Sequence, residues 1–203
     1  MVKVKICGIT NLEDAVAAVG AGCDALGFVF FKASPRYITP LKAKKIISQL
    51  PERVIKIGVF AAAREKTVKR VARQCHLDIL QFHGNETPEY CGHFKNYKII
   101  KTFRVKGRVD ENMLAQYHPF AYLFDTYLKS KLGGTGKKFN WNLITRLDLK
   151  HPVFLSGGLS EKNVRQAINK VRPEWVDASS SLEARPGKKD HQKVKDFIKT
   201  AKK

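Results

Sequence analysis

The chain has 203 residues, 43% of them hydrophobic, four cysteines and a formal net charge of +20. This length favours one domain with a sizeable core, and no run approaches the roughly 18 apolar residues of a membrane span, so we expect no membrane segment and no secretory signal. The cysteines are scattered without a Cys-x-x-Cys pair, which argues against a zinc site and a disulfide framework and favours a reducing, cytoplasmic compartment.

Short runs rich in Ile, Val, Phe and Leu alternate with longer amphipathic segments, as expected for strands buried on both faces and helices that cover them. The expected strands begin near Val2, Ala25, Val54, Ile79, Lys98, Tyr122, Val153 and Trp175. The expected helices are Leu12–Val19, Leu41–Leu50, Glu65–Gln74, Thr87–Phe94, Glu111–Tyr117, Trp141–Leu149, Lys162–Val171 and His191–Ala201. Eight evenly spaced units predict a single (β/α)8 TIM barrel domain over residues 1–203 rather than a doubly wound sheet.

Residues at helix starts support these divisions. Thr39 precedes Pro40, and proline is favoured in the first turn of a helix. Asn140 precedes Trp141 and is a good N-cap, while Ser160 and Asn163 lie at the expected start of the seventh helix.

Polar side chains gather where the expected strands end, which is the edge of a barrel that carries chemistry. Because side chains alternate along a strand, Lys5 and Cys7 are expected to point into the barrel. An unpaired lysine would be costly there, so we expect Lys5 to pair with Asp177 of the neighbouring last strand. Asp125 closes strand six on the same edge, so a thiol, two carboxylates and a lysine are expected to converge at one mouth.

The segments after strands seven and eight suggest a phosphate site. Gly157 and Gly158 follow strand seven, and Ser179, Ser180 and Ser181 follow strand eight. Glycines let backbone amides approach an anion, and serines add hydroxyl donors. Barrels often bind phosphate on these two loops.

A third glycine-rich segment, residues 133–137, follows Asp125. It lacks the spacing of a phosphate-binding Walker A loop. A lid after strand six and a mobile surface loop are equally good interpretations.

Together these segments resemble the phosphoribosylanthranilate isomerases, nearly from end to end. The segments that carry the resemblance are Lys5–Thr10, Ala25–Phe30, Ser34–Tyr37, Leu80–Gly84, Phe124–Thr126, Gly133–Lys137, Leu155–Gly158, Asn163–Val164 and Pro186–Asp190. The resemblance implies a TIM barrel without cofactor or metal. The expected reaction is the Amadori rearrangement of N-(5-phosphoribosyl)anthranilate in tryptophan biosynthesis.

The resemblance also implies roles for particular residues. It makes Cys7 the general base and Asp125 the general acid, and it places Arg36 and His83 at the substrate. Asp177 is counted with them as a substrate-binding residue. The phosphate maps onto Gly157, Gly158, Ser179 and Ser180.

Two positions depart from the family pattern. Ser181 stands where the family usually has glycine, so we expect either backbone strain at a positive φ or a shifted loop. Asn140 stands where the family often has aspartate, which we expect to matter little because both residues cap helices well.

Other interpretations remain open. The chain could instead be a different enzyme with a phosphosugar-binding barrel. A histidine-biosynthesis isomerase would need an aspartate on the first strand, and an indoleglycerol-phosphate synthase would need an N-terminal extension. The net charge of +20 alternatively suggests a nucleic-acid-binding module, but no recognition motif accompanies it. We therefore expect a small phosphoribosyl substrate, no specific nucleic acid, and a monomer or homodimer.

Overall fold

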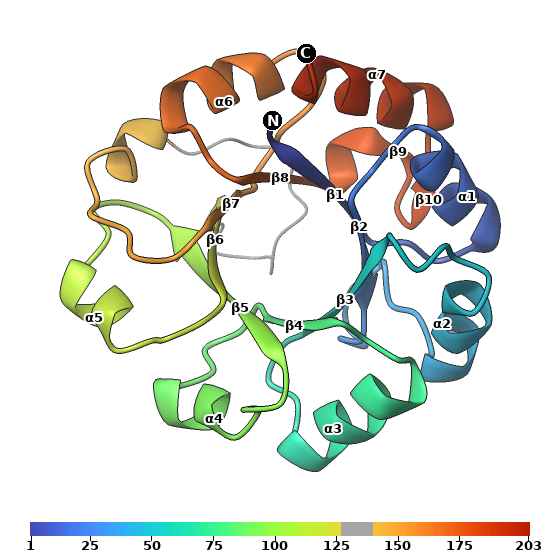
Figure 1. The fold of residues 1–203 in the computed structure, drawn as a ribbon, viewed down its shortest axis with the longest axis horizontal. Coiled ribbons are helices and arrows are strands. Elements are labelled where there is room, and N and C mark those ends of the chain that lie inside the picture. Colours follow the sequence, from blue (N-terminus) through green and yellow to red (C-terminus); the bar gives the residue numbers. More distant parts are fainter. Residues whose placement is uncertain (127–139) are drawn as a thin grey trace.

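The computed structural model describes residues 1–126 and 140–203, and these form a ring of parallel strands surrounded by helices (Figure 1). The barrel strands are β1 (Lys3–Cys7), β2 (Ala25–Val29), β3 (Ile55–Phe60), β4 (Ile79–Phe82), β5 (Lys98–Val105), β6 (Ala121–Thr126), β7 (Val153–Leu155) and β8 (Trp175–Ala178). Each strand pairs with the next, and β8 pairs in parallel with β1, which closes the barrel. The prediction of a closed barrel is confirmed, and the doubly wound alternative is wrong.

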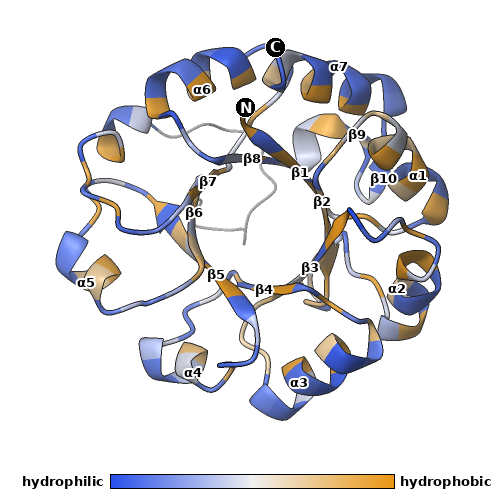
Figure 2. Cartoon of the chain, in the orientation of Figure 1, coloured by the Kyte–Doolittle hydropathy of each residue, from blue (hydrophilic) through white to orange (hydrophobic). Residues whose placement is uncertain are grey.

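The outer layer consists of helices that follow the strands in sequence. They are α1 (Leu12–Gly20), α2 (Pro40–Ile47), α3 (Glu65–Gln74), α4 (Pro88–Gly92), α5 (Glu111–Ala115), α6 (Val164–Val171) and α7 (His191–Ala201). Figure 2 shows hydrophobic residues on the helix faces toward the ring and hydrophilic ones outside. In α7, for example, Val194, Phe197, Ile198 and Ala201 are buried at helical spacing.

The second helix begins as predicted. The Thr39 side chain accepts a hydrogen bond from the Lys42 amide, and Pro40 is the first residue of α2. The start of α6 differs slightly from the prediction. The helix begins at Val164. The Asn163 side chain instead accepts a hydrogen bond from the Ser160 amide, at 2.9 Å. Asn163 therefore closes the turn before the helix rather than capping the helix itself.

The prediction of a helix over Trp141–Leu149 is wrong. Only a short 3-10 turn, η1 (Trp141–Leu143), forms there. Asn140 does cap this turn, because its side chain accepts a hydrogen bond from the Asn142 amide at 3.1 Å. The hydroxyl of Thr145 donates back to the carbonyl of Asn142. Side chains of this kind compete with helical hydrogen bonds, so the helix does not continue.

A small hairpin follows β8. The 3-10 turn η2 (Ser180–Leu182) leads into β9 (Glu183–Arg185), which pairs antiparallel with β10 (Lys188–Lys189). This hairpin was not expected from the sequence. It brings two charged side chains toward the mouth of the barrel, as described below.

The described residues form three hydrophobic clusters. The largest fills the space between the strands and the helices, and the smallest consists of Cys7, Val29 and Val59. The third lies inside the barrel and consists of Ala25, Ile57, Ile79, Ile100, Ala121, Leu123, Phe154 and Trp175. Leu123 and Trp175 lie on the inner face, and because side chains alternate along a strand, Asp125 and Asp177 also point inward at the strand ends.

Candidate active site

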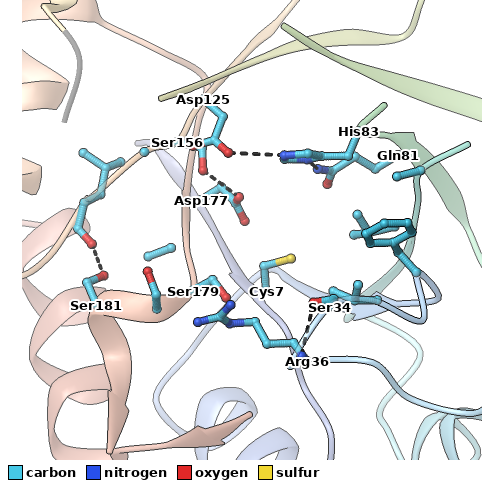
Figure 3. Close-up of a pocket in the computed structure, with 18 of the residues that line it drawn as sticks. Cys7, Ser34, Arg36, Gln81, His83, Asp125, Ser156, Asp177, Ser179 and Ser181 are labelled. Carbon is cyan, nitrogen blue, oxygen red and sulfur yellow. Dashed lines mark hydrogen bonds and ion pairs between the residues drawn. The ribbon is translucent and has the colours of Figure 1, made fainter. Parts of the chain in front are cut away.

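A pocket opens at the C-terminal ends of the strands, and Figure 3 shows side chains from opposite sides of the barrel pointing into it. All nine site residues predicted from the sequence line this pocket. They are Cys7, Arg36, His83, Asp125, Gly157, Gly158, Asp177, Ser179 and Ser180. The structure therefore brings every one of them to the same cavity.

The first part of the site joins β1 to β8. Lys5 is completely buried, and its Nζ donates to Asp177 Oδ1 at 2.8 Å, as predicted. The two residues are direct neighbours in the β1–β8 register. Asp177 Oδ2 accepts a hydrogen bond from the Ser156 hydroxyl at 3.0 Å. The carboxylate is thus fixed from both sides, next to Cys7.

Cys7 occupies space that a glycine on the neighbouring strand leaves open. A Cβ at Gly27 would come within 2.7 Å of the Cys7 Sγ. Burial raises the pKa of the Cys7 thiol above its usual value, although the charge of Lys5 and, more weakly, that of Lys189 lower it. Lys5 is a cation beside the thiol, but the effect of burial on the pKa of Cys7 outweighs that of the Lys5 charge.

Lys5 keeps its charge in this buried position. Burial alone lowers the pKa of Lys5, but the negative charges of Asp177 and Cys7 raise it above its ordinary value. The ammonium group is therefore a permanent positive charge beneath the thiol.

The second part of the site joins β4 to β6. His83 Nε2 lies 3.2 Å from Asp125 Oδ2, while His83 Nδ1 is 3.0 Å from the side-chain amide of Gln81. The backbone amide of Thr126 donates to Asp125 Oδ1 at 2.8 Å. Gln81 therefore sets the plane of the imidazole, and the imidazole faces the carboxylate that the sequence assigned as the acid.

The third part consists of the loops after β7 and β8. Gly157 has a φ of +90°, and a Cβ there would lie 2.3 Å from the Thr126 hydroxyl oxygen. Asn163 donates to the carbonyl of Gly158 at 2.9 Å, which fixes the turn. Ser179 Oγ is buried and has no hydrogen-bond partner among the described residues. A buried hydroxyl without a partner is well suited to receive a ligand oxygen.

Of the two outcomes expected at Ser181, strain at a positive φ is absent. Ser181 lies within η2, and it is not among the described residues with positive φ. Its hydroxyl donates to the carbonyl of Leu159 and so ties the β8 loop to the β7 loop. A serine fits here because the 3-10 turn uses a conformation open to any residue.

Arg36 projects from the loop after β2 and meets a residue that sequence reasoning missed. Its guanidinium makes a two-point contact with Glu183, with Nε–Oε1 and Nη2–Oε2 distances of 2.8 and 2.7 Å. Lys189 contacts the same carboxylate at 3.0 Å. The Pro186–Asp190 segment carried part of the resemblance, but no role was predicted for Lys189, and no sequence pattern pointed to Glu183.

Three further findings bear on the predictions. The glycine-rich segment 133–137 lies outside the described residues. Within 1–126 and 140–203, no cluster of three His, Cys, Asp or Glu side chains could hold a metal ion. The helices of these two ranges include no membrane-spanning candidate.

Comparison with known proteins identifies the family. The family model described as N-(5'-phosphoribosyl)anthranilate (PRA) isomerase matches residues 4–200. The chain belongs to the N-(5'-phosphoribosyl)anthranilate isomerase family. This confirms the resemblance drawn from the sequence.

Curated members of this family match over the whole chain. The N-(5'-phosphoribosyl)anthranilate isomerase of Citrifermentans bemidjiense is 49% identical over 203 residues, covering 100% of this chain and 98% of the relative. That of Pelobacter propionicus is 47% identical over 202 residues, covering 100% and 96%.

Solved structures of the family share the fold. Phosphoribosyl anthranilate isomerase from Thermotoga maritima superposes with a TM-score of 0.90 at 42% identity, covering 100% of this chain and 99% of that one. A phosphoribosyl anthranilate isomerase in complex with reduced 1-(o-carboxyphenylamino)-1-deoxyribulose 5-phosphate superposes with a TM-score of 0.87 at 41% identity, covering 100% and 99%.

Proposed function

We propose that this pocket catalyses the Amadori rearrangement of N-(5-phosphoribosyl)anthranilate to 1-(2-carboxyphenylamino)-1-deoxyribulose 5-phosphate, a step of tryptophan biosynthesis, by general acid–base catalysis. The observation that carries the mechanism is that Cys7 from β1 and Asp125 from β6 open onto one cavity from different sides (Figure 3). The reaction needs an acid and a base that reach different atoms of one sugar. Family membership supplies the substrate class.

Asp125 is the acid in this proposal. It protonates the ring oxygen of the furanose, so that the ring opens and a Schiff base forms between C1′ and the anthranilate nitrogen. The imidazole of His83 lies beside the carboxylate, with Nε2 3.2 Å from Asp125 Oδ2, so it borders the side of the acid that faces the pocket. The Thr126 amide fixes the other carboxylate oxygen, so the proton-bearing oxygen has a defined direction.

Cys7 is the base. Its thiolate removes the proton from C2′ of the Schiff base, which gives an enolamine that tautomerises to the ketone. The buried ammonium group of Lys5 stabilises the thiolate, and the Asp177 carboxylate holds Lys5 in place. Asp177 also lines the pocket, where it can accept a hydrogen bond from a sugar hydroxyl.

Two anion sites anchor the ends of the substrate. Arg36 binds the anthranilate carboxylate, while Gly157, Gly158, Ser179 and Ser180 bind the phosphate. The unpartnered Ser179 hydroxyl supports the phosphate assignment, because a ligand oxygen would satisfy it.

The setting of the enzyme completes the proposal. The 203 residues act as one domain. The rearrangement opens the furanose ring and shifts protons within one molecule, without an external oxidant or reductant, so we expect activity without cofactor or metal. We place the enzyme in the cytoplasm, as a monomer or homodimer with no specific nucleic-acid partner. The four free cysteines are compatible with a reducing compartment.

The deciding experiment follows the loss of anthranilate fluorescence when purified protein is added to freshly formed N-(5-phosphoribosyl)anthranilate in excess EDTA. Decay well above the spontaneous rate is expected. Heat-inactivated protein serves as the control. A decay no faster than that control would overturn the proposal, and activity that appears only after metal is added would overturn the metal-free mechanism.

A further inference from the structure

A buried cluster of three charges lies behind the substrate-facing side of Arg36. Glu183 is at its centre, bound by Arg36 at 2.7 and 2.8 Å and by Lys189 Nζ at 3.0 Å. Lys189 Nζ also donates to the backbone carbonyl of Ser179 at 3.1 Å. The exposed fractions of the Lys189, Glu183 and Arg36 side chains are 0%, 4% and 11%. Lys189 is fully buried but is not one of the two acid–base residues, so its burial needs another explanation.

The β9–β10 hairpin builds this cluster. Its register places Lys189 directly opposite Glu183, so both side chains point inward. The adjacent Lys188 is one-third exposed and pairs with Glu13 at 2.7 Å. Two consecutive lysines thus have different surroundings, and Lys188 is a natural control for Lys189.

The orientation of the Arg36 guanidinium leaves one edge for a ligand. A guanidinium carries five N–H donors in a planar fork. Glu183 takes the Nε–H and one Nη2 hydrogen, which leaves the Nη1 and Nη2 edge for a second planar anion. Arg36 lines the pocket, so this edge can receive a carboxylate from the substrate.

Charge explains why Lys189 is needed. Arg36 and Glu183 alone form a neutral pair, so the repulsion from Glu183 offsets part of the attraction that Arg36 exerts on an arriving carboxylate. Lys189 gives the cluster a net charge of one positive unit, which a bound carboxylate neutralises. Burial lowers the pKa of Lys189 against the opposing effect of Glu183, and Arg36 adds to the lowering.

We propose that Lys189, acting through Glu183, is the positioning residue that gives Arg36 its selectivity for a substrate with a carboxylate on its aromatic ring. The inference rests on the function proposed above and adds to it the residue that sets carboxylate affinity. Lys189 does not touch the reacting atoms, so its loss should affect binding of the carboxylate end and leave the proton transfers in place.

The test measures the affinity of two ligands by isothermal titration calorimetry. One is reduced 1-(o-carboxyphenylamino)-1-deoxyribulose 5-phosphate, and the other is the same compound without the carboxyl group. Lys189→Met should weaken binding of the first by about 10- to 100-fold and of the second by less than about threefold. Lys188→Met should leave both affinities unchanged.

A double variant separates charge from packing. Glu183→Gln combined with Lys189→Met removes one charge of each sign, so the cluster regains its net positive unit from Arg36. Its preference for the carboxylate ligand should recover to within about fivefold of wild type. Because the double variant buries no unbalanced new charge, it also provides the test if Lys189→Met alone does not fold.

Each contrary outcome has a distinct meaning. Equal weakening of both ligands by Lys189→Met, or a double variant without carboxylate preference, would overturn the role of Lys189. A wild-type protein that isomerises the substrate but binds both ligands equally would overturn this inference alone. A wild-type protein that neither isomerises nor binds would overturn the proposed function with it.

Discussion

The interior of the barrel has an apolar floor and a charged mouth. The floor is the cluster of Ala25, Ile57, Ile79, Ile100, Ala121, Leu123, Phe154 and Trp175, in which the last two rings stack with centroids 4.7 Å apart. The mouth holds Cys7, Asp125 and Asp177, of which none is more than 8% exposed. Lys5 lies at the boundary, because its neighbours in register are Ala25 and Asp177.

The two regions affect stability in opposite ways. Removal of apolar area from water contributes about 25 cal/mol per Å² to folding, whereas a buried charge is costly unless it is paired. The floor therefore stabilises the barrel. The mouth lowers the free energy of unfolding, because ionisable groups are held out of water there. Substitutions in the two regions should separate activity from stability.

The largest effect on activity is expected at the mouth. Cys7→Ala and Asp125→Asn should each lower kcat by about 10²- to 10⁴-fold, because each removes a positioned acid or base. The free energy of unfolding should change little or rise slightly, since a buried ionisable group is lost. Steady-state kinetics and urea denaturation measure the two quantities.

Cys91→Ala is the matched control, since Cys91 is only partly buried and lies outside the pocket. It should retain full activity. A near-normal kcat in Cys7→Ala or in Asp125→Asn would remove that residue from the mechanism.

The floor should show the opposite behaviour. Phe154→Ala is expected to lower the free energy of unfolding by about 3–5 kcal/mol, because it deletes a fully buried ring that stacks on Trp175. The kcat of the protein that remains folded should stay close to wild type. The exposed Leu41→Ala provides the comparison, with an expected change within about 0.5 kcal/mol. A large fall in kcat without loss of stability would contradict the division.

Lys5 belongs to both regions and should affect both quantities. Lys5→Met leaves the Asp177 carboxylate buried without its cation, which should cost about 3–5 kcal/mol of stability. Adding Asp177→Asn should recover most of this loss, because no unpaired charge remains. Turnover at neutral pH should stay low in both variants, since Cys7 has lost its nearest cation.

Denaturation curves and kcat for the two Lys5 variants test this expectation together. Recovery of turnover along with stability in the double variant would show that Lys5 acts on packing alone.

The smallest effect concerns pH and again separates the two quantities. Burial raises the pKa of Cys7, and the thiolate is the active form, so kcat should rise by up to about tenfold per pH unit above neutrality. The same raised pKa means that Cys7 contributes to stability fully below about pH 8.5, the value in an unfolded chain. That contribution is lost as pH rises through the pKa of the folded state.

From neutrality to about pH 8.5, kcat should therefore rise while the Cys7 contribution to stability stays constant, and above that pH the contribution should fall. The profile of kcat and the urea midpoint, both recorded from about pH 6 to 10, check this. A kcat that is flat or falling between pH 7 and 9 would count against a thiolate base.

The inward-facing residues were the most predictable part of the molecule. Alternation along β1 placed Lys5 and Cys7 inside the barrel, and the cost of an unpaired buried charge led to Asp177 as the partner. Both expectations are confirmed because strands with two buried faces leave little choice of orientation.

Less predictable were features that depend on pairing between distant or weakly patterned segments. Glu183 and Lys189 belong to a polar stretch that resembles an exposed tail, and only the hairpin register turns them inward. The expected helix at Trp141 failed because local side-chain hydrogen bonds outweighed its apolar spacing. The prediction for Ser181 was based on the glycine that the family usually has there, whereas this chain adopts a turn that does not need glycine.

The pairing of β1 with β8 has a consequence for how the protein reaches its active form. The Lys5–Asp177 contact joins residues 172 positions apart, so it forms only when the two ends of the chain meet. Such distant contacts are slow to form during folding. A chain emerging from the ribosome therefore keeps Lys5 without its carboxylate until nearly the whole sequence has been synthesised. The enzyme should gain its activity in one late event, together with closure of the ring.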